Sequence, residues 1–137
     1  MNGSVAVAVL DASALIAFLY DEPGTHRVEA VLGRGALMSM VNWAEVVADM
    51  AARGETVEVS APRARRVIEK VGTLELVPFD EGHAHESARL RMPTKSLGLS
   101  LGDRACLSLG RIRRLPVLTT DGAWRSLRLS IKVVLIR

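Results

Sequence analysis

The sequence predicts an α/β fold in which a central, mostly parallel sheet of about five strands is flanked by helices on both faces. Short apolar runs, typical of buried parallel strands, alternate with longer runs of helical periodicity. Strands separated by helices favour right-handed crossovers, which keep neighbouring strands parallel. With 137 residues and no repeat, linker or low-complexity tract, the chain is expected to form a single domain over residues 1–137.

The N-terminal half contains two predicted strands and three predicted helices. The run VAVAVL is apolar and β-branched without polar alternation, which is typical of a central strand covered on both faces. Ser13 can cap the first helix, and an apolar stripe that starts near Asn42 and stops at Gly54 predicts the third. The expected elements are a strand at 5–10, helices at 13–20 and 25–32, a strand at 36–40 and a helix from 42 to the stop at 54.

The C-terminal half contains three further strands and three further helices. Pro93 ends one of the helices, and Lys132 inside the last strand indicates an edge position in the sheet. The expected elements are a helix at 60–71, a strand at 73–77, a helix at 81–92, a loop at 94–102, a helix at 103–111 and strands at 116–119 and 131–136.

Four acidic residues lie where strand-like runs meet helical runs: Asp11, Glu45, Asp103 and Asp121. Ligands of open α/β sheets bind beyond the carboxyl ends of the strands, so carboxylates placed there by separate segments can converge on one point. Each acid alone could be a simple turn or cap residue. Four independent turn residues have no reason to share one edge of a sheet, and we therefore interpret them as one site.

Two of these acids also have the spacing of a capping box. Glu45 follows Asn42 by three residues, and Asp103 follows Ser100 by three residues. Capping and ligand binding do not exclude each other, because a residue in the first turn of a helix lies near the positive end of the helix dipole and can also point into the cleft.

Carboxylates gathered in one cleft require a cation. Two carboxylates roughly 5 Å apart repel each other by about 3 kcal/mol at an effective dielectric near 20. The cluster must therefore take up protons or bind a divalent ion, and all-oxygen ligands favour Mg²⁺ or Mn²⁺. Such an ion is suited to phosphodiester hydrolysis.

Five stretches of the chain carry a resemblance to a known family. They read VLDASALIAFLYDEPG, SMVNWAEVV, GLSLGDRACLSLG, PVLTTDGAW and LRLSIKVVLIR. Their content and order resemble the PIN-domain ribonucleases, specifically the VapC toxins of type II toxin-antitoxin pairs. The family's acidic quartet carries over to Asp11, Glu45, Asp103 and Asp121, and its supporting polar positions carry over to Ser13, Asn42 and Thr119.

The resemblance implies a Mg²⁺-dependent endoribonuclease that hydrolyses RNA with a metal-activated water. Asp11 and Asp103 would be the principal metal ligands, and Glu45 and Asp121 would bind the ion directly or through water. The family also implies a homodimer and a cognate antitoxin protein whose C-terminal segment places a basic side chain in the cleft. The alternative is a PIN-like module that binds RNA or a protein without cutting.

The basic residues are nearly all arginine, which suits bidentate phosphate contacts, and the net charge of +3 is compatible with an RNA partner. Two arginine runs are candidates for holding phosphates, although such runs are also typical of solvated helix faces. They are Arg63, Arg65 and Arg66 in the first run, and Arg111, Arg113 and Arg114 in the second.

The remaining residues favour a cytoplasmic protein that does not enter a membrane. The apolar N-terminal stretch lacks a basic flank and carries Asp11 at its centre, and the lone Cys106 excludes an internal disulfide. Both tryptophans, Trp43 and Trp124, are expected in a core or interface. The histidines, at positions 26, 83 and 85, are expected to be surface or hydrogen-bonded structural residues.

Overall fold

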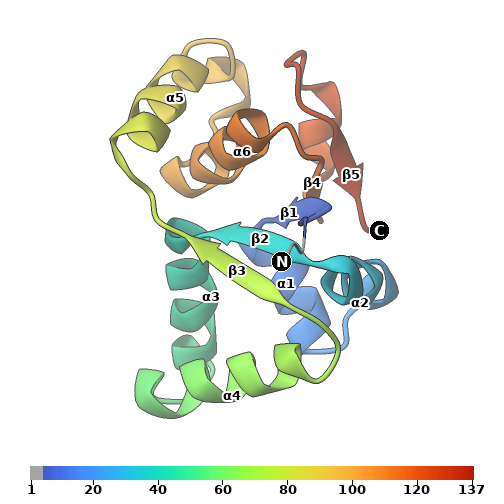
Figure 1. Ribbon diagram of the computed structural model, residues 1–137. Coiled ribbons are helices and arrows are strands. Elements are labelled where there is room, and N and C mark those ends of the chain that lie inside the picture. The colour runs from blue at the N-terminus through green and yellow to red at the C-terminus, as the bar shows by residue number, and fades with distance from the viewer. Residues whose placement is uncertain (1–4) are drawn as a thin grey trace.

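The computed structural model describes residues 5–137 and contains one five-stranded sheet with helices on both faces (Figure 1). The strand order is β3-β2-β1-β4-β5, and every neighbouring pair is parallel. The strands are β1 (Ala8–Leu10), β2 (Ala36–Ser39), β3 (Leu74–Val77), β4 (Val117–Thr119) and β5 (Val133–Leu135). The helices are α1 (Ala12–Leu19), α2 (Thr25–Arg34), α3 (Met40–Ala52), α4 (Val57–Glu69), α5 (Glu81–Arg91) and α6 (Leu101–Arg113), with short 3₁₀ turns η1 (Lys95–Leu97) and η2 (Gly122–Ser126).

Alternate residues of each strand face two separate hydrophobic clusters. In β1, Ala8 and Leu10 belong to a cluster completed by α1, α2, α3 and α4, whereas Val9 belongs to a second cluster completed by α5, α6 and η2. Figure 1 shows α5 and α6 above the sheet and α1, α3 and α4 below it. All three residues of β1 are almost fully inaccessible to solvent. The predicted central, doubly covered strand and the predicted α/β class are therefore confirmed.

The predicted strand positions hold within a few residues, and β5 lies at the edge of the sheet as Lys132 indicated. Several helix starts were predicted wrongly. The side chain of Asp11, not Ser13, caps α1, and Ser39 caps α3. Asn42 is therefore inside the helix, and no capping box joins it to Glu45.

Two other helices start earlier than the sequence predicted. Helix α4 begins at Val57. Its first turn faces solvent, and because Val57 and Val59 are exposed, they are not part of the buried face from which the helix was predicted. Helix α6 begins at Leu101, directly after its N-cap Ser100, and the predicted capping box between Ser100 and Asp103 is confirmed.

Helix α2 and the segment after β4 also differ from the prediction. Helix α2 continues to Arg34 and ends at Gly35, whose φ of 104° only glycine adopts readily, instead of at Gly33. The segment after β4 forms the unpredicted turn η2, which buries Trp124 in the second cluster. The expectation of a core position for Trp124 is confirmed.

Two other expectations concern buried side chains. Cys106 is fully buried on α6, as expected for a small apolar residue. His83 is also buried, and its Nδ1 has no hydrogen-bond partner, so the expectation of a surface or hydrogen-bonded residue is wrong at that atom. Between residues 5 and 137, no helix combines the length and the hydrophobicity that a membrane span requires.

The contact between Gly24 and Ile136 ties the end of the chain to the start of α2. Gly24 has a φ of 97°, and an added Cβ would lie 2.7 Å from both Cγ1 and the carbonyl oxygen of Ile136. We predict that Gly24→Ala lowers the free energy of unfolding by about 2–4 kcal/mol, combining left-handed strain with overpacking. Gly54→Ala is the matched control, because Gly54 has a φ of 105° with nothing within 4 Å of the added Cβ. Equal losses for the two variants in urea unfolding would show that Ile136 contributes nothing.

Candidate active site

The four acids lie at the edge of the sheet where the strands end. Asp11 directly follows β1, and Asp121 follows β4 by two residues. Glu45 is the sixth residue of α3, which continues from β2, and Asp103 is the third residue of α6. Because all five strands are parallel, their carboxyl ends share this edge. The structure thus brings to one edge the four acids that the sequence analysis singled out.

Asp11 is the buried member of the group, with 6% of its surface exposed. Its Oδ1 accepts hydrogen bonds from the Ser13 hydroxyl at 2.7 Å and from the backbone N–H of Ala14 at 2.8 Å. Its Oδ2 accepts one from the Thr119 hydroxyl at 2.5 Å. The carboxylate is therefore fixed at both oxygens, and it connects β1, α1 and β4.

Ser13 and Thr119 extend these contacts to the loop after β4. The Ser13 hydroxyl accepts a hydrogen bond from the backbone N–H of Thr120 at 3.1 Å, and the Thr119 hydroxyl accepts one from Asp121 at 3.0 Å. The Asp121 side chain caps η2 by accepting a bond from the N–H of Ala123 at 2.9 Å, and it is otherwise exposed. Both hydroxyls thus place Asp121 relative to Asp11.

Glu45 is positioned by a contact between α3 and α6. Asn42 is 1% exposed, and its Nδ2 donates to Glu45 Oε1 at 2.9 Å and to the carbonyl oxygen of Gly102 at 3.0 Å. A Cβ on Gly102 would lie 2.2 Å from Glu45 Oε2. Gly102 therefore leaves the space that the carboxylate of Glu45 occupies, a role that the sequence analysis missed. Its only sequence signal is a glycine in the first turn of a helix directly before a candidate ligand.

Asp103 is held by the capping box at the start of α6. Its Oδ2 accepts a bond from the N–H of Ser100 at 3.0 Å, and its own N–H donates to the Ser100 hydroxyl at 3.1 Å. Burial raises the pKa of the Cys106 thiol well above its ordinary value, and the negative charges of Asp11, Asp103 and Glu45 each raise it further. The fully buried Cys106 follows Asp103 by three residues on α6, so it lies about one turn further along that helix.

The electrostatics of the site are those of an unneutralised cluster. Burial raises the pKa of Asp11 to about 6, against the lowering effect of its hydrogen bonds from Thr119, Ala14 and Ser13, and the charge of Asp103 raises it further. None of the ion pairs found between residues 5 and 137 includes any member of the acidic quartet.

The residues present fit a hard cation bound partly through water. Among the described residues, no three His, Cys, Asp or Glu side chains form a group that could hold one ion directly. Asn42 Oδ1, however, is buried without a hydrogen-bond partner beside Glu45. Mg²⁺ usually keeps several of its waters and binds only one or two carboxylates directly. An orphaned acceptor next to carboxylates suits a water of that shell.

The two arginine runs lie away from the acids. On α4, Arg63 forms a bidentate ion pair with Glu55, and Arg65 donates to the carbonyl oxygen of Leu74 at 3.0 Å. Arg113 lies at the opposite end of α6 from Asp103, about 15 Å along the helix axis. That the two runs hold phosphates stays a prediction, but neither lies next to the acids.

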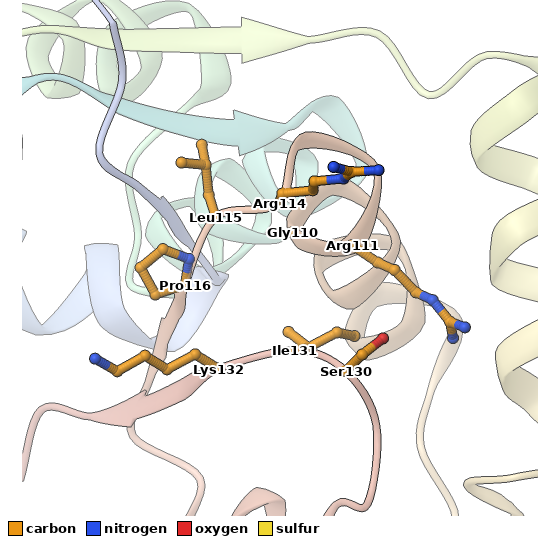
Figure 2. Close-up of a pocket in the computed structure, with 8 residues that line it drawn as sticks. All are labelled: Gly110, Arg111, Arg114, Leu115, Pro116, Ser130, Ile131 and Lys132. Atoms are coloured by element: carbon orange, nitrogen blue, oxygen red, sulfur yellow. The ribbon is translucent and has the colours of Figure 1, made fainter.

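A pocket lies at the same far end of α6. It has a volume of about 630 Å³, and Gly110, Leu115, Pro116 and Ile131 supply apolar lining. Figure 2 shows the Arg111 and Arg114 side chains extending to one side and that of Lys132 to the other. These cations do not converge on one point, and none of the four acids lines the pocket.

Solved structures of similar fold include components of several toxin-antitoxin complexes. FitAcB from Neisseria gonorrhoeae is similar with a TM-score of 0.72 and 20% identity, covering 95% of this chain and 98% of that one. VapBC2 from Rickettsia felis, bound to a promoter DNA fragment, has a TM-score of 0.70 and 13% identity, covering 93% of this chain and 97% of that one. VapBC-5 from Mycobacterium tuberculosis has a TM-score of 0.60 and 24% identity, covering 96% of this chain and 99% of that one. At these identities the likeness shows the fold.

A comparison with curated protein sequences finds no match. The PIN domain family, by contrast, matches residues 8–128, which include all four acids of the quartet and the elements from β1 to η2. That match spans most of the sequence, and so the chain belongs to the PIN domain family.

Proposed function

We propose that this protein is a Mg²⁺- or Mn²⁺-dependent endoribonuclease that acts as the toxin of a toxin-antitoxin pair. The observation that carries the proposal is the acidic edge itself: four carboxylates from four segments, with no ion-pair partner among residues 5–137. A protein that only binds RNA gains nothing from unpaired carboxylates, because they repel phosphates. A nuclease needs them to hold the cation that phosphodiester cleavage requires.

Each residue of the site has a distinct part in this mechanism. Asp11 and Asp103 are the principal ligands of the ion, and the Ser13 and Thr119 hydroxyls orient the two oxygens of Asp11. Asn42 orients Glu45, which reaches the ion directly or through water. When bound, the ion polarises a phosphoryl oxygen and activates water for attack.

Asp121 is exposed at the start of η2, where its Oδ1 accepts a hydrogen bond from the backbone N–H of Ala123. An exposed carboxylate can accept the proton of the attacking water and release it to solvent. In this proposal Asp121 therefore either completes the water shell of the ion or takes that proton.

The partners follow from the family and the charge of the chain. RNA is the substrate that the net charge of +3 suits, and the similar VapBC-5 from Mycobacterium tuberculosis is a member of the VapBC family of toxin-antitoxin systems. We accordingly propose a cognate antitoxin that covers the acidic edge, a homodimeric toxin and a cytoplasmic site of action.

The first test is metal-dependent cleavage of total RNA by the purified chain. Asp103→Asn should reduce the rate by at least about 100-fold, because it removes a proposed ligand, while its Oδ1 can still accept the bond from the N–H of Ser100. Asp21→Asn is the matched control, since Asp21 is exposed and its φ of 52° suits asparagine. Cleavage that persists in EDTA, or that survives Asp103→Asn, would refute the proposal in favour of contamination or a binding module.

The second prediction concerns stability without metal. The pKa of Asp11 rises from 3.8 to about 6 on folding, so the folded state binds more protons than the unfolded state between these values. In chelator, the free energy of unfolding should therefore fall by about 3 kcal/mol as the pH rises from below 4 to above 6. Asp11→Asn should remove this fall, and Asp21→Asn should keep it. Urea unfolding across this pH range is the measurement, and an unchanged slope in Asp11→Asn would contradict the assignment.

The third prediction concerns Gly102. In Gly102→Ala the new Cβ displaces the Glu45 carboxylate, so cleavage should fall roughly 10–100-fold. The free energy of unfolding should change by less than about 1 kcal/mol, because Glu45 is exposed and alanine favours the helix. Gly82→Ala on α5 is the control, since its nearest contact would be an ordinary 3.4 Å. Adding Glu45→Ala to Gly102→Ala should cost nothing more, and additive losses would show that Gly102 acts elsewhere.

A further inference from the structure

The charges of this chain are divided unequally along the sequence. The first 86 residues carry thirteen acidic and seven basic side chains, whereas the last 51 carry two acidic and eleven basic ones. Both of those two acids, Asp103 and Asp121, belong to the proposed active site. The second part of the chain forms the end of α5, then η1, α6, β4, η2 and β5. These elements therefore carry a large excess of positive charge.

Many of these eleven cations are engaged or remote. Arg89 and Arg111 both pair with Glu86, and Arg104 donates to the carbonyl oxygen of Ser87 at 3.1 Å. Arg113 and Arg114 lie at the end of α6 that is distant from Asp103. The connection between α5 and α6 carries two further cations that have no such contact within the described part of the chain.

That connection forms a pocket of about 210 Å³ lined by Arg91, Thr94, Lys95, Gly98 and Leu99. Within residues 5–137, no carboxylate lies within 4 Å of the charged end of Arg91 or Lys95. Both side chains are exposed. They are cations without a protein partner on the walls of one small pocket.

The pocket adjoins the proposed ligand Asp103. Its last lining residue, Leu99, immediately precedes Ser100, whose N–H lies 3.0 Å from Asp103 Oδ2. Arg91 ends α5, Lys95 begins η1 and Asp103 lies in the first turn of α6, so all three are placed by the connection between these helices.

This connection is also fixed in place. Thr94 is 2% exposed, and its hydroxyl donates to the carbonyl oxygen of Leu90 at 2.7 Å. Gly98 then reverses the chain with a φ of 61°. A pocket held in this way keeps its cations at a constant offset from the acidic edge, which is what positioning a substrate requires.

We propose that Arg91 and Lys95 bind a phosphate of the RNA strand beside the phosphate that is cut. The inference rests on the proposed nuclease function and adds to it a positioning site outside the acidic quartet. An acidic protein segment fits this place less well, because the carboxylates of the quartet repel it. RNA would approach the same edge together with the divalent cations that neutralise those carboxylates. A flexible single strand can also follow the surface from the pocket to the acids.

The test compares two double variants that remove the same charge. Arg91→Ala/Lys95→Ala removes the pocket cations, and Arg113→Ala/Arg114→Ala removes two cations from the far end of α6. Binding of a labelled single-stranded RNA to each is measured by fluorescence anisotropy at several salt concentrations, in an Asp103→Asn background that prevents cleavage. Cleavage is measured in the active chain, and thermal unfolding confirms that each variant folds.

The pocket variant should raise Kd and KM roughly tenfold with kcat unchanged, since it removes charge-assisted bonds to a phosphate that does not react. The slope of log Kd against log salt should fall by about 0.7 for the lost phosphate contact. The far variant should weaken binding less than the pocket variant does, because its arginines lie about 15 Å along α6 from Asp103. Lys95→Glu alone should weaken RNA binding further than Lys95→Ala.

The outcomes separate this proposal from the proposed function. If the chain cuts RNA but the two double variants bind it equally well, the pocket is refuted and the nuclease stands. If the chain binds RNA with the expected dependence on Arg91 and Lys95 but cuts none, the pocket stands and the nuclease is refuted. A pocket variant that loses as much affinity for polyglutamate as for RNA would assign the pocket to an acidic protein segment and overturn the proposal.

Discussion

One buried carboxylate, that of Asp11, organises the centre of this structure. It caps α1, accepts a hydrogen bond from the Thr119 hydroxyl of β4 and follows β1 directly. Three elements therefore meet at one charged group. Burying a carboxylate without a paired cation is costly, and the raised pKa of Asp11 expresses that cost. Stability alone would favour a neutral residue there. The cost is consistent with a site that exchanges stability for affinity toward a cation.

The neighbouring acids are held by contacts that serve both the fold and the site. The capping box of Ser100 satisfies N–H groups at the start of α6 and also fixes the direction of Asp103. Asn42 bridges α3 and α6 by binding Glu45 and the carbonyl oxygen of Gly102 together. Helix packing and carboxylate placement are therefore coupled, and a shift of α3 against α6 would move Glu45 relative to Asp103.

The fold class and the acidic quartet could be read from the sequence because both depend on local patterns. A doubly covered strand such as β1 has an unbroken apolar run, Asp11 stands at a clear junction of strand and helix, and Asp103 stands three residues after the helix cap Ser100. Contacts between distant segments leave no such pattern. The cap assigned to Ser13 belongs to Asp11 because Ser13 binds Asp11 and Thr120 instead. The space that Gly102 leaves for Glu45 depends on how α3 and α6 pack, and no sequence spacing encodes it.

The separation of positive from negative side chains has a chemical reason. An arginine beside the quartet would pair with it and occupy the place of a metal ion, because a bidentate guanidinium-carboxylate contact is strong. Arg104 follows Asp103 directly, yet it turns to the backbone of Ser87 on α5 and leaves the acid unpaired. Basic residues that serve an anionic substrate must therefore stand near the carboxylates without touching them. The fixed connection that carries Arg91 and Lys95 meets that condition, since it adjoins Asp103 through the backbone and not through an ion pair.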